Sequence, residues 1–275
     1  MVATVGVYLR GGLGNRLFLA AAAHGIAATS GRVAVIVGAD PSAHSGRTYV
    51  DSVFGDFARR PAAHAGAYAH AQVTVVEPAN RCLSYDGPPM APIDASILLS
   101  GYFQNERYLE GQKAEFAARL RLPPVSPEAG AIFIHVRRGD YLRNRFHAVD
   151  LSGYFARAVE LAKTTFGARL RRVLAFSDDP AWCRSNLAVI LGGDLLVEVA
   201  EDADEEVALA RMAACELGGI CANSSFSWWG AFLGYAPDKL VTFPSTWFNH
   251  APSSDPGAGA FVNDVAFAGS VRVEC

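Results

Sequence analysis

The second half of the chain alternates short apolar segments with longer segments that have a helical period. The apolar segments have the length of strands, and glycine-rich or polar residues follow several of them. Strands that alternate with helices build a parallel sheet with helices on both faces. The expected strands are Ala131–Val136, Arg172–Phe176, Leu195–Val199, Gly219–Ala222 and Leu240–Phe243, and the expected helices are Leu151–Phe166, Pro180–Leu191, Asp204–Cys215 and Ser225–Tyr235.

The first half of the chain begins like a second unit of the same type. A buried strand, an alanine-rich helix to about Ala28 and another strand follow one another, as in a β-α-β unit. The expected elements here are strands at Val2–Leu9, Val33–Val37, Val73–Val76 and Ile97–Phe103, and an amphipathic helix at Asn105–Leu120. Three prolines in residues 121–130 interrupt regular structure, so we expect two domains, 1–125 and 126–275. The tail at 251–260 is expected to be a loop.

Composition excludes several classes of function. Hydrophobic residues make up 51% of the 275 residues and charged residues 19%, which is typical of a globular protein. The net charge of -3 and the absence of basic runs argue against nucleic acid or an anionic membrane surface as the main partner. Five widely spaced cysteines without a C-x-x-C pair predict neither a disulfide framework nor a zinc site. We find neither a signal peptide nor a membrane span, so a cytoplasmic location is expected.

Two adjacent arginines directly follow the strand at Ala131–Val136. In parallel sheets, ligands bind outside the carboxyl ends of the strands. Charged groups near a sheet end are costly unless they are paired, so the sequence HVRRGDY at 135–141 has two interpretations. Either one of Arg137 and Arg138 binds a phosphate while Asp140 holds the other, or the arginines and Asp140 form a structural clamp.

Two further loops follow later strands of the same predicted sheet. Asp178 and Asp179 lie before Pro180, where they could coordinate a metal, accept hydrogen bonds from a base or ribose, or cap the next helix. A metal is disfavoured because no third hard ligand lies at short spacing. The segment NSSFSWWG at 223–230 opens a helix, where backbone N–H groups and hydroxyls favour an anion, although an ordinary N-cap is the alternative.

A glycine loop, GGLGN at 11–15, follows the first strand. It lacks the full G-x-G-x-x-G pattern and the acidic residue expected about 20 positions later, so a nicotinamide oxidoreductase is disfavoured. The glycines instead indicate a close approach of the backbone to a ligand or to the other domain.

Together these motifs resemble the α-1,2-fucosyltransferase family, the GDP-fucose-dependent inverting glycosyltransferases of family 11. The resemblance rests on the order of GGLGN, HVRRGDY and FSDD (176–179), followed by ARMAAC and GGICANSSFSWWGAFL within 210–233 and PSTWF at 244–248. Residues 39–95 match nothing in it. The resemblance implies an α/β fold of GT-B-like type, with two Rossmann-like domains and a cleft between them. GDP-fucose is expected on the C-terminal domain, and an oligosaccharide or glycoside acceptor, often galactose, in the cleft.

The resemblance also implies roles for single residues. Arg137 and Arg138 match the basic pair linked to the diphosphate, and Ser224, Ser225 and Phe226 match the segment that holds the phosphate. His135, Asp178 and Asp179 fall where the guanine edge is read. Gly12, Gly14 and Asn15 match the N-terminal loop that faces the donor. Arg16, Arg143 and Arg145 are expected near the cleft, and Arg16 and Leu19 depart from the family's glutamines.

Arginines and helix-terminal N–H groups would stabilise the charge that develops on a GDP leaving group, without a divalent cation. The catalytic residues expected are Arg137 and a base for the acceptor hydroxyl, for which His147 and Asp140 are the candidates. The alternatives are another, metal-dependent sugar-nucleotide transferase and a non-catalytic GDP-sugar-binding module. The acceptor sugar and the oligomeric state cannot be read from the sequence.

Overall fold

Two parallel β-sheets organise the chain, one in each of two units. The computed structural model of the protein describes residues 2–43, 45–59, 71–78, 81–201, 204–249 and 264–275. Unit 1 extends to Leu122 and also includes Asp264 and Val265, whereas unit 2 begins at Pro123 and includes the C-terminal residues from Ala266. The division after Leu122 lies three residues before the boundary predicted at 125/126.

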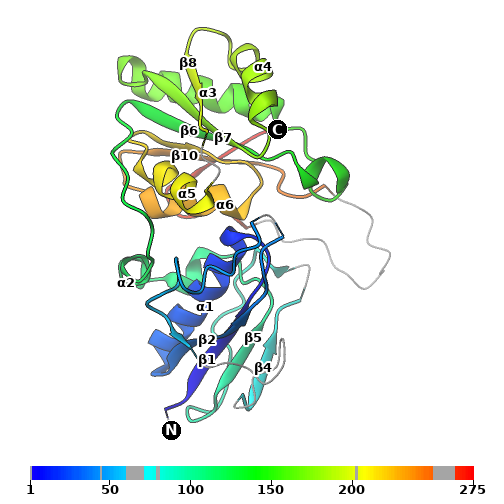
Figure 1. Ribbon diagram of the computed structural model, residues 1–275, viewed down its shortest axis with the longest axis vertical. Coiled ribbons are helices and arrows are strands. Elements are labelled where there is room, and N and C mark those ends of the chain that lie inside the picture. Colours follow the sequence, from blue (N-terminus) through cyan, green and yellow to red (C-terminus); the bar gives the residue numbers. More distant parts are fainter. Residues whose placement is uncertain (1, 44, 60–70, 79–80, 202–203, 250–263) are drawn as a thin grey trace. The chain divides into compact units, whose positions relative to one another are not determined.

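Unit 1 contains a five-stranded sheet with the order β3-β2-β1-β5-β4, in which every strand pair is parallel. Helix α1 packs against β1 and β2 (Figure 1). The helix is long and almost wholly buried because its sequence is rich in alanine and leucine. The elements are β1 (Thr4–Leu9), α1 (Leu13–Ser30), β2 (Val33–Ala39), β3 (Ala58–Arg59), β4 (Val73–Val76), β5 (Ile97–Ser100), the 3-10 helix η2 (Glu106–Leu109) and α2 (Lys113–Ala118).

Unit 2 contains a six-stranded parallel sheet with the order β11-β10-β9-β6-β7-β8. Figure 1 shows α3 and α4 on one face of this sheet and α5 and α6 on the other. The elements are β6 (Ala131–Val136), η3 (Asp140–Arg143), α3 (Ser152–Phe166), η4 (Gly167–Arg169), β7 (Arg172–Ser177), α4 (Pro180–Ile190), β8 (Leu196–Val199), α5 (Glu205–Ala214), β9 (Gly218–Ile220), α6 (Ser225–Gly234), β10 (Leu240–Pro244) and β11 (Val271–Val273).

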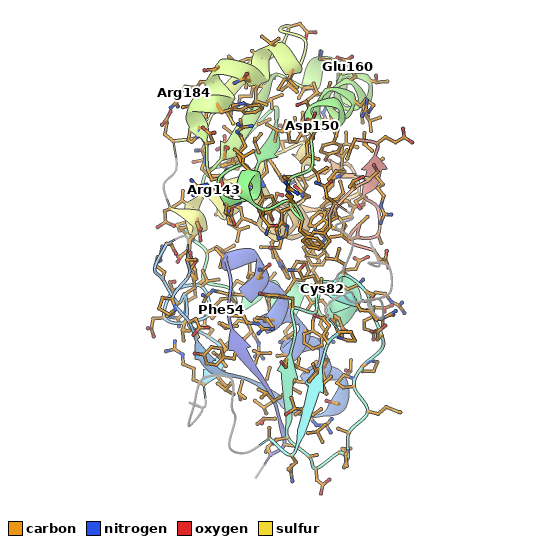
Figure 2. All side chains as sticks on the ribbon, turned by 90° about the vertical axis from the view of Figure 1, so that its right-hand side faces the viewer. Phe54, Cys82, Arg143, Asp150, Glu160 and Arg184 are labelled. Atoms are coloured by element: carbon orange, nitrogen blue, oxygen red, sulfur yellow. The ribbon has the colours of Figure 1, made fainter. Side chains whose placement is uncertain are left out.

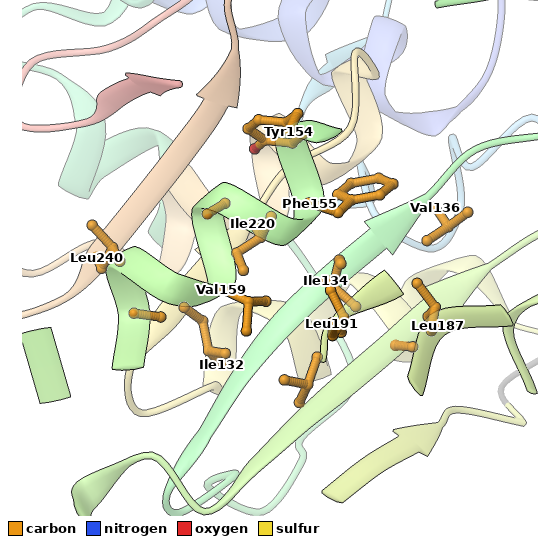
Figure 3. Close-up of a cluster of buried hydrophobic side chains, with 14 of the residues drawn as sticks. Ile132, Ile134, Val136, Tyr154, Phe155, Val159, Leu187, Leu191, Ile220 and Leu240 are labelled. Carbon is orange, nitrogen blue, oxygen red and sulfur yellow. The ribbon is translucent and has the colours of Figure 1, made fainter. Parts of the chain in front are cut away.

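The central strand β6 has apolar residues on both faces. Its residues Ile132, Ile134 and Val136 pack against α3 through Tyr154, Phe155 and Val159 (Figure 3). The alternation of side chains along a strand turns Phe133 and His135 to the opposite face, where Phe133 contacts Phe176 edge to face. A strand covered on both faces requires a continuous apolar run, which is why β6 could be predicted from the sequence.

The two α/β units confirm the predicted fold class, and three differences in detail have physical causes. The helix predicted at Asn105–Leu120 is divided into η2 and α2, because Gly111 between them has a positive φ of 73°. The strand predicted to end at Phe103 ends at Ser100, and Phe103 itself has φ of 52°. The edge strands β3 and β11 were not predicted, because each is only two or three residues long. The tail predicted as a loop at 251–260 lies outside the described residues.

Candidate functional site

Three loops meet at the carboxyl edge of the sheet in unit 2. Strand β6 is hydrogen-bonded to β7 on one side and to β9 on the other, and all three run in the same direction. The loops that follow them start at Arg137, Asp178 and Cys221. The topology therefore brings together the three motifs that the sequence separates by about 40 residues each.

Arg137 and Arg138 are held by carboxylates from their own loop and from the loop that follows β7. Nη2 of Arg137 donates to Oδ1 of Asp140 at 2.6 Å, and its Nη1 lies 3.0 Å from Oδ2 of Asp178. The backbone N–H of Arg138 donates to Oδ1 of Asp178 at 2.9 Å. Nε of Arg138 donates to Oδ2 of Asp179 at 3.1 Å. The acids therefore fix both guanidinium groups in place. This geometry fits both the structural clamp and the phosphate site that the sequence predicts as alternatives.

Arg138 keeps part of its hydrogen-bonding capacity for another group. Its guanidinium carbon lies 4.1 Å from the centre of the Trp182 ring, and its side chain is one quarter exposed. In the part of the chain that the structure describes, no residue accepts from Nη1 or Nη2 of Arg138. A rigid guanidinium with unused terminal donors is suited to a phosphate, which accepts two parallel hydrogen bonds.

Asp179 also caps helix α4. Its Oδ1 accepts from the backbone N–H of Trp182 at 3.1 Å, and its own N–H donates to Oγ of Ser177 at 2.9 Å. The hydrogen bond from Trp182 and the contact with Arg138 hold the pKa of the Asp179 carboxyl below its ordinary value. Three roles were considered for this acid pair: metal coordination, binding of a base or ribose, and helix capping. The structure shows helix capping by Asp179, and both acids also fix the arginines.

The N-terminus of α6 forms the third side of the site. Ser224 is the N-cap residue, and its side chain accepts from the backbone N–H of Phe226 at 3.3 Å. No acidic residue lies in the first turn of α6. Ser225 and Phe226 are partly exposed there, whereas Ser224 is buried. A helix N-terminus of this kind favours an anion.

His135 is buried near the carboxyl end of β6. It is the fifth residue of β6, is 5% exposed and has its ring centre 5.7 Å from that of Phe226. Burial, with a contribution from Arg137, lowers the pKa of His135 to about 3, so this imidazole is neutral. Its Nδ1 is enclosed, and no described residue forms a hydrogen bond with it.

Hydrogen bonds from Asn223 and Asn249 hold the backbone of the segment that contains His147. Nδ2 of Asn223 donates to the carbonyl of His147 at 3.0 Å and to that of Trp247 at 2.9 Å. Asn249 donates from its backbone N–H to the carbonyl of Phe146, and from Nδ2 to the carbonyls of Arg145 and Ala148. The four successive carbonyls of residues 145–148 therefore all accept a hydrogen bond.

Tyr141 connects this segment to the arginines. Its ring stacks on that of His147 with centres 4.6 Å apart, and the guanidinium carbon of Arg137 lies 5.3 Å from its centre. Its hydroxyl donates to the carbonyl of Asn223 at 3.2 Å. Burial raises the pKa of Tyr141 to about 12, so the phenol stays protonated. Tyr141 and Asn223 are part of the motifs quoted above, but only their positions in the fold indicate their roles.

The remaining arginines of the segment are exposed. Arg143, on η3, is labelled in Figure 2, and both it and Arg145 lie at the surface of unit 2. Among the residues that the structure describes, none forms a side-chain contact that would fix these two arginines to the site.

The glycine loop of unit 1 surrounds a buried arginine. Gly11 has φ of 75°, and a side chain there would meet Asn15. Gly12 is the N-cap of α1, Gly14 is buried in its first turn, and Oδ1 of Asn15 accepts from Gln104 at 2.7 Å. Arg16 is completely buried and donates to the carbonyls of Gly11, Asp40 and Thr48. Its guanidinium holds loops of unit 1 together, a structural role that the sequence did not predict.

Within the described ranges, no three His, Cys, Asp or Glu side chains are grouped closely enough to hold a metal ion. Among the same residues, no helix combines the length and the apolar character required to cross a membrane.

The chain is similar to several known proteins. It is 28% identical over 167 residues to an α-1,2-colitosyltransferase of Escherichia coli, covering 56% of this chain and 57% of that protein. It is 27% identical over 244 residues to a galactoside 2-α-L-fucosyltransferase of Caenorhabditis elegans, covering 82% of this chain and 66% of that protein. The chain thus spans less than two thirds of the length of either relative.

A solved structure and a family model agree with these relatives. The crystal structure of the α-1,6-fucosyltransferase NodZ soaked with GDP-fucose matches 84% of this chain and 92% of its own, with a TM-score of 0.53 and 14% identity. This likeness shows that the two α/β units have a GT-B-like fold. The model of the family described as "Glycosyl transferase family 11" matches residues 102–252, which is more than half of the chain. The chain therefore belongs to glycosyl transferase family 11.

Proposed function

We propose that the protein is an inverting α-1,2-fucosyltransferase that moves L-fucose from GDP-L-fucose to the 2-hydroxyl of an acceptor sugar such as galactose. The names of the relatives from E. coli and C. elegans support the α-1,2 linkage and a 6-deoxy-sugar donor. The observation that carries the proposal is the meeting of Arg137, Arg138 and the N-terminus of α6 at one sheet edge.

The reaction requires this edge to stabilise a leaving group. Negative charge develops on the diphosphate of GDP as the glycosidic bond breaks, and preorganised donors lower the energy of that state. Arg138 offers the terminal N–H groups that no described residue uses, and Arg137 is oriented by two carboxylates. The N–H groups of the first turn of α6 lie at the positive end of the helix dipole, where that of Phe226 donates to Oγ of Ser224.

Two further groups of residues are assigned from the family resemblance alone. By the family resemblance, His135, Asp178 and Asp179 lie beside the guanine, and Gly12, Gly14 and Asn15 face the donor.

We assign the base that deprotonates the acceptor hydroxyl to Asp140. Its side chain is 59% exposed, and only Oδ1 accepts from Arg137, so Oδ2 is the acceptor atom.

The proposed enzyme works without a divalent cation. Oxygens of Asp178 and Asp179 accept hydrogen bonds from Arg137, Arg138 and Trp182, which gives both acids roles other than metal coordination. We expect the rate of transfer to be the same with EDTA and with added magnesium. A requirement for metal would favour the alternative of a metal-dependent sugar-nucleotide transferase.

The direct test is the release of GDP from GDP-fucose in the presence of free sugars and glycosides with and without a 2-hydroxyl. We expect release with galactosides and none with 2-deoxygalactosides, and NMR of the product should show an α-1,2-fucoside. A parallel reaction with GDP-colitose tests which donor is preferred, because one relative is named for colitose. A protein that binds GDP-fucose but releases no GDP with any acceptor would be a binding module.

We further propose a cytoplasmic location. All five cysteines are unpaired thiols, as expected for a reducing compartment. Fractionation of cells that produce the protein tests this proposal, and recovery in the membrane fraction would contradict it.

A further inference from the structure

The ring of His147 is enclosed by aromatic side chains. It stacks on Tyr141 at an interplanar angle of 19°, and the edges of Phe146 and Phe248 complete the surroundings at centre distances of 5.2 and 5.4 Å. Nδ1 of His147 is buried among these groups, and no group of the described residues forms a hydrogen bond with it. The hydrogen bonds of Asn223 and Asn249 to the backbone of this segment keep the ring in its place.

This enclosure decides which nitrogen carries the proton. In a neutral imidazole one nitrogen has the N–H and the other is an acceptor, and the hydrogen bond at one nitrogen selects the state of the other. A buried N–H without an acceptor is rarer in proteins than an unused acceptor, because the donor has only one direction in which to be satisfied. The proton of His147 therefore belongs on Nε2, and Nδ1 keeps its lone pair.

A base at His147 would need the opposite arrangement. To accept a proton at Nε2, the ring must carry its own proton on Nδ1, which in hydrolase triads is held by a carboxylate. No such group lies at Nδ1 of His147 among the described residues. Protonation would also leave a cation with one N–H facing aromatic rings. Burial lowers the pKa of His147, and although Asp140 opposes this change, Arg137 adds to it.

We propose that His147 is a neutral hydrogen-bond donor whose Nε2–H binds a diphosphate oxygen of GDP-fucose. We propose further that His147 is not the catalytic base. The inference rests on the proposed function for the identity of the ligand. Tyr141 links His147 to Arg137 through its two ring contacts and to the start of α6 through its hydroxyl. The ring thus belongs to the part of the sheet edge where an anion is expected, and the charged groups that act on it are Arg137 and Asp140.

The first test is the tautomer itself, measured by ¹⁵N NMR on the histidine-labelled full chain, with the resonances of His147 assigned from the His147→Gln variant. We expect a pyridine-type Nδ1 and a pyrrole-type Nε2 between pH 6 and 8, without and with GDP. A pyrrole-type Nδ1 overturns the proposal. This readout does not depend on transferase activity, so it stands even if the proposed function fails.

The second test compares three variants by GDP affinity and by transfer. A glutamine amide can place an N–H where Nε2 lies, an asparagine amide reaches only the position of Nδ1, and alanine offers no donor. We expect His147→Gln to bind GDP within about threefold of the parent and to transfer within about tenfold, whereas His147→Ala and His147→Asn bind GDP about tenfold or more weakly. Circular dichroism and thermal unfolding show that each variant is folded.

The outcomes distinguish a hydrogen-bond donor from a catalytic base at His147. If His147 were the base, all three variants would lose about 10²–10⁴-fold in rate, glutamine included, while GDP affinity stayed unchanged. Unchanged GDP affinity in His147→Ala therefore overturns the proposal. If the parent protein binds no GDP, the proposed function fails together with the diphosphate contact, and the NMR result alone then decides the tautomer.

Discussion

Asn223 donates from Nδ2 to the main-chain carbonyl of His147 at 3.0 Å, although 76 residues separate them in the sequence. The same nitrogen donates to the carbonyl of Trp247, and the carbonyl of Asn223 accepts from Tyr141. One buried amide thus joins the segments that follow β6, β9 and β10. The first turn of α6 starts next to this residue, so the geometry of the anion site depends on the same contacts.

Replacing Asn223 with alanine is expected to weaken both folding and transfer. The side chain is 2% exposed, and its removal takes away two hydrogen bonds, one to the carbonyl of Trp247 and one to that of His147, which then keeps only the N–H of Val149. Each such loss costs about 1–3 kcal/mol, so we expect the free energy of unfolding to fall by roughly 2–4 kcal/mol and transfer to fall at least about tenfold. Urea denaturation and a GDP-release assay measure the two effects.

Asn186→Ala is the matched control for Asn223→Ala. Its Nδ2 donates to a single carbonyl, that of Trp182, one turn back on α4. We expect a loss below about 1 kcal/mol and normal transfer. Equal losses in the two variants would contradict the role of Asn223 as the link between three segments.

Arg137→Ala is expected to reduce transfer by about a hundredfold or more, which corresponds to about 3 kcal/mol of transition-state stabilisation. The reason is the loss of a guanidinium that Asp140 and Asp178 hold in a fixed direction. Arg169→Ala is the control, because this arginine is exposed and pairs with Glu216 before β7 begins, at the opposite end of the strands. Near-normal turnover in Arg137→Ala would remove this arginine from the donor site.

Gly25 and Gly153 are expected to respond in opposite ways to alanine. A side chain at Gly25 of α1 would overlap the main-chain carbonyl of Tyr108, which cannot move without displacing η2. We expect Gly25→Ala to lower the free energy of unfolding by about 2 kcal/mol or more. At Gly153, in the first turn of α3, only the flexible end of Arg157 is near, at 2.9 Å.

We expect Gly153→Ala to be neutral or to stabilise by up to about 1 kcal/mol, because alanine restricts the unfolded chain and favours the helix. Urea unfolding of both variants measures the difference. Equal destabilisation would mean that the close approach of Tyr108 to α1 is not what Gly25 provides.

The sheet of unit 2 could be predicted because its strands have a local signature. A strand covered on both faces is a short apolar run, and β6, β7 and β10 have this pattern with little ambiguity. The edge strand β11 has no such signature, since it pairs on one side only and its residues are largely exposed.

The site was predictable to the extent that its residues follow strands directly. Arg137, Asp178 and Ser224 follow β6, β7 and β9, which are neighbours in the parallel sheet, so the topology brings them to one edge. The roles of Asn223 and Asn249 could not be predicted, because they bind main-chain carbonyls whose positions depend on the folded loops. The structural role of Arg16 could not be predicted for the same reason, because its guanidinium donates to the carbonyls of Gly11, Asp40 and Thr48.

Glu128 is expected to make the stability of unit 2 depend on pH in the acid range. Its Oε1 accepts from Arg211 at 2.7 Å and its Oε2 from Arg172 at 2.6 Å, with the side chain 12% exposed. Burial raises the pKa of this carboxyl, but the hydrogen bonds and charges of the two arginines outweigh burial and hold the pKa below its ordinary value of 4.5. The ionised form is therefore the one that stabilises the fold.

Because the folded pKa of Glu128 is depressed, its contribution is fully present above pH 4.5 and is lost as the pH falls through the folded value. We expect Glu128→Gln to lower the free energy of unfolding by about 2–3 kcal/mol at pH 7, since two partly buried arginines lose their charge partner. As the pH falls from 4.5 through the depressed folded pKa, the Glu128 carboxyl becomes neutral like the glutamine amide of the variant, so the difference should shrink. Urea unfolding at several pH values from 7 to 3 measures this trend.

The control is Glu115→Gln, which affects an exposed pair with Arg119 and should change the free energy of unfolding by less than about 0.5 kcal/mol at every pH. A difference between parent and Glu128→Gln that stays constant with pH would show that the charge of Glu128 is not what stabilises the fold.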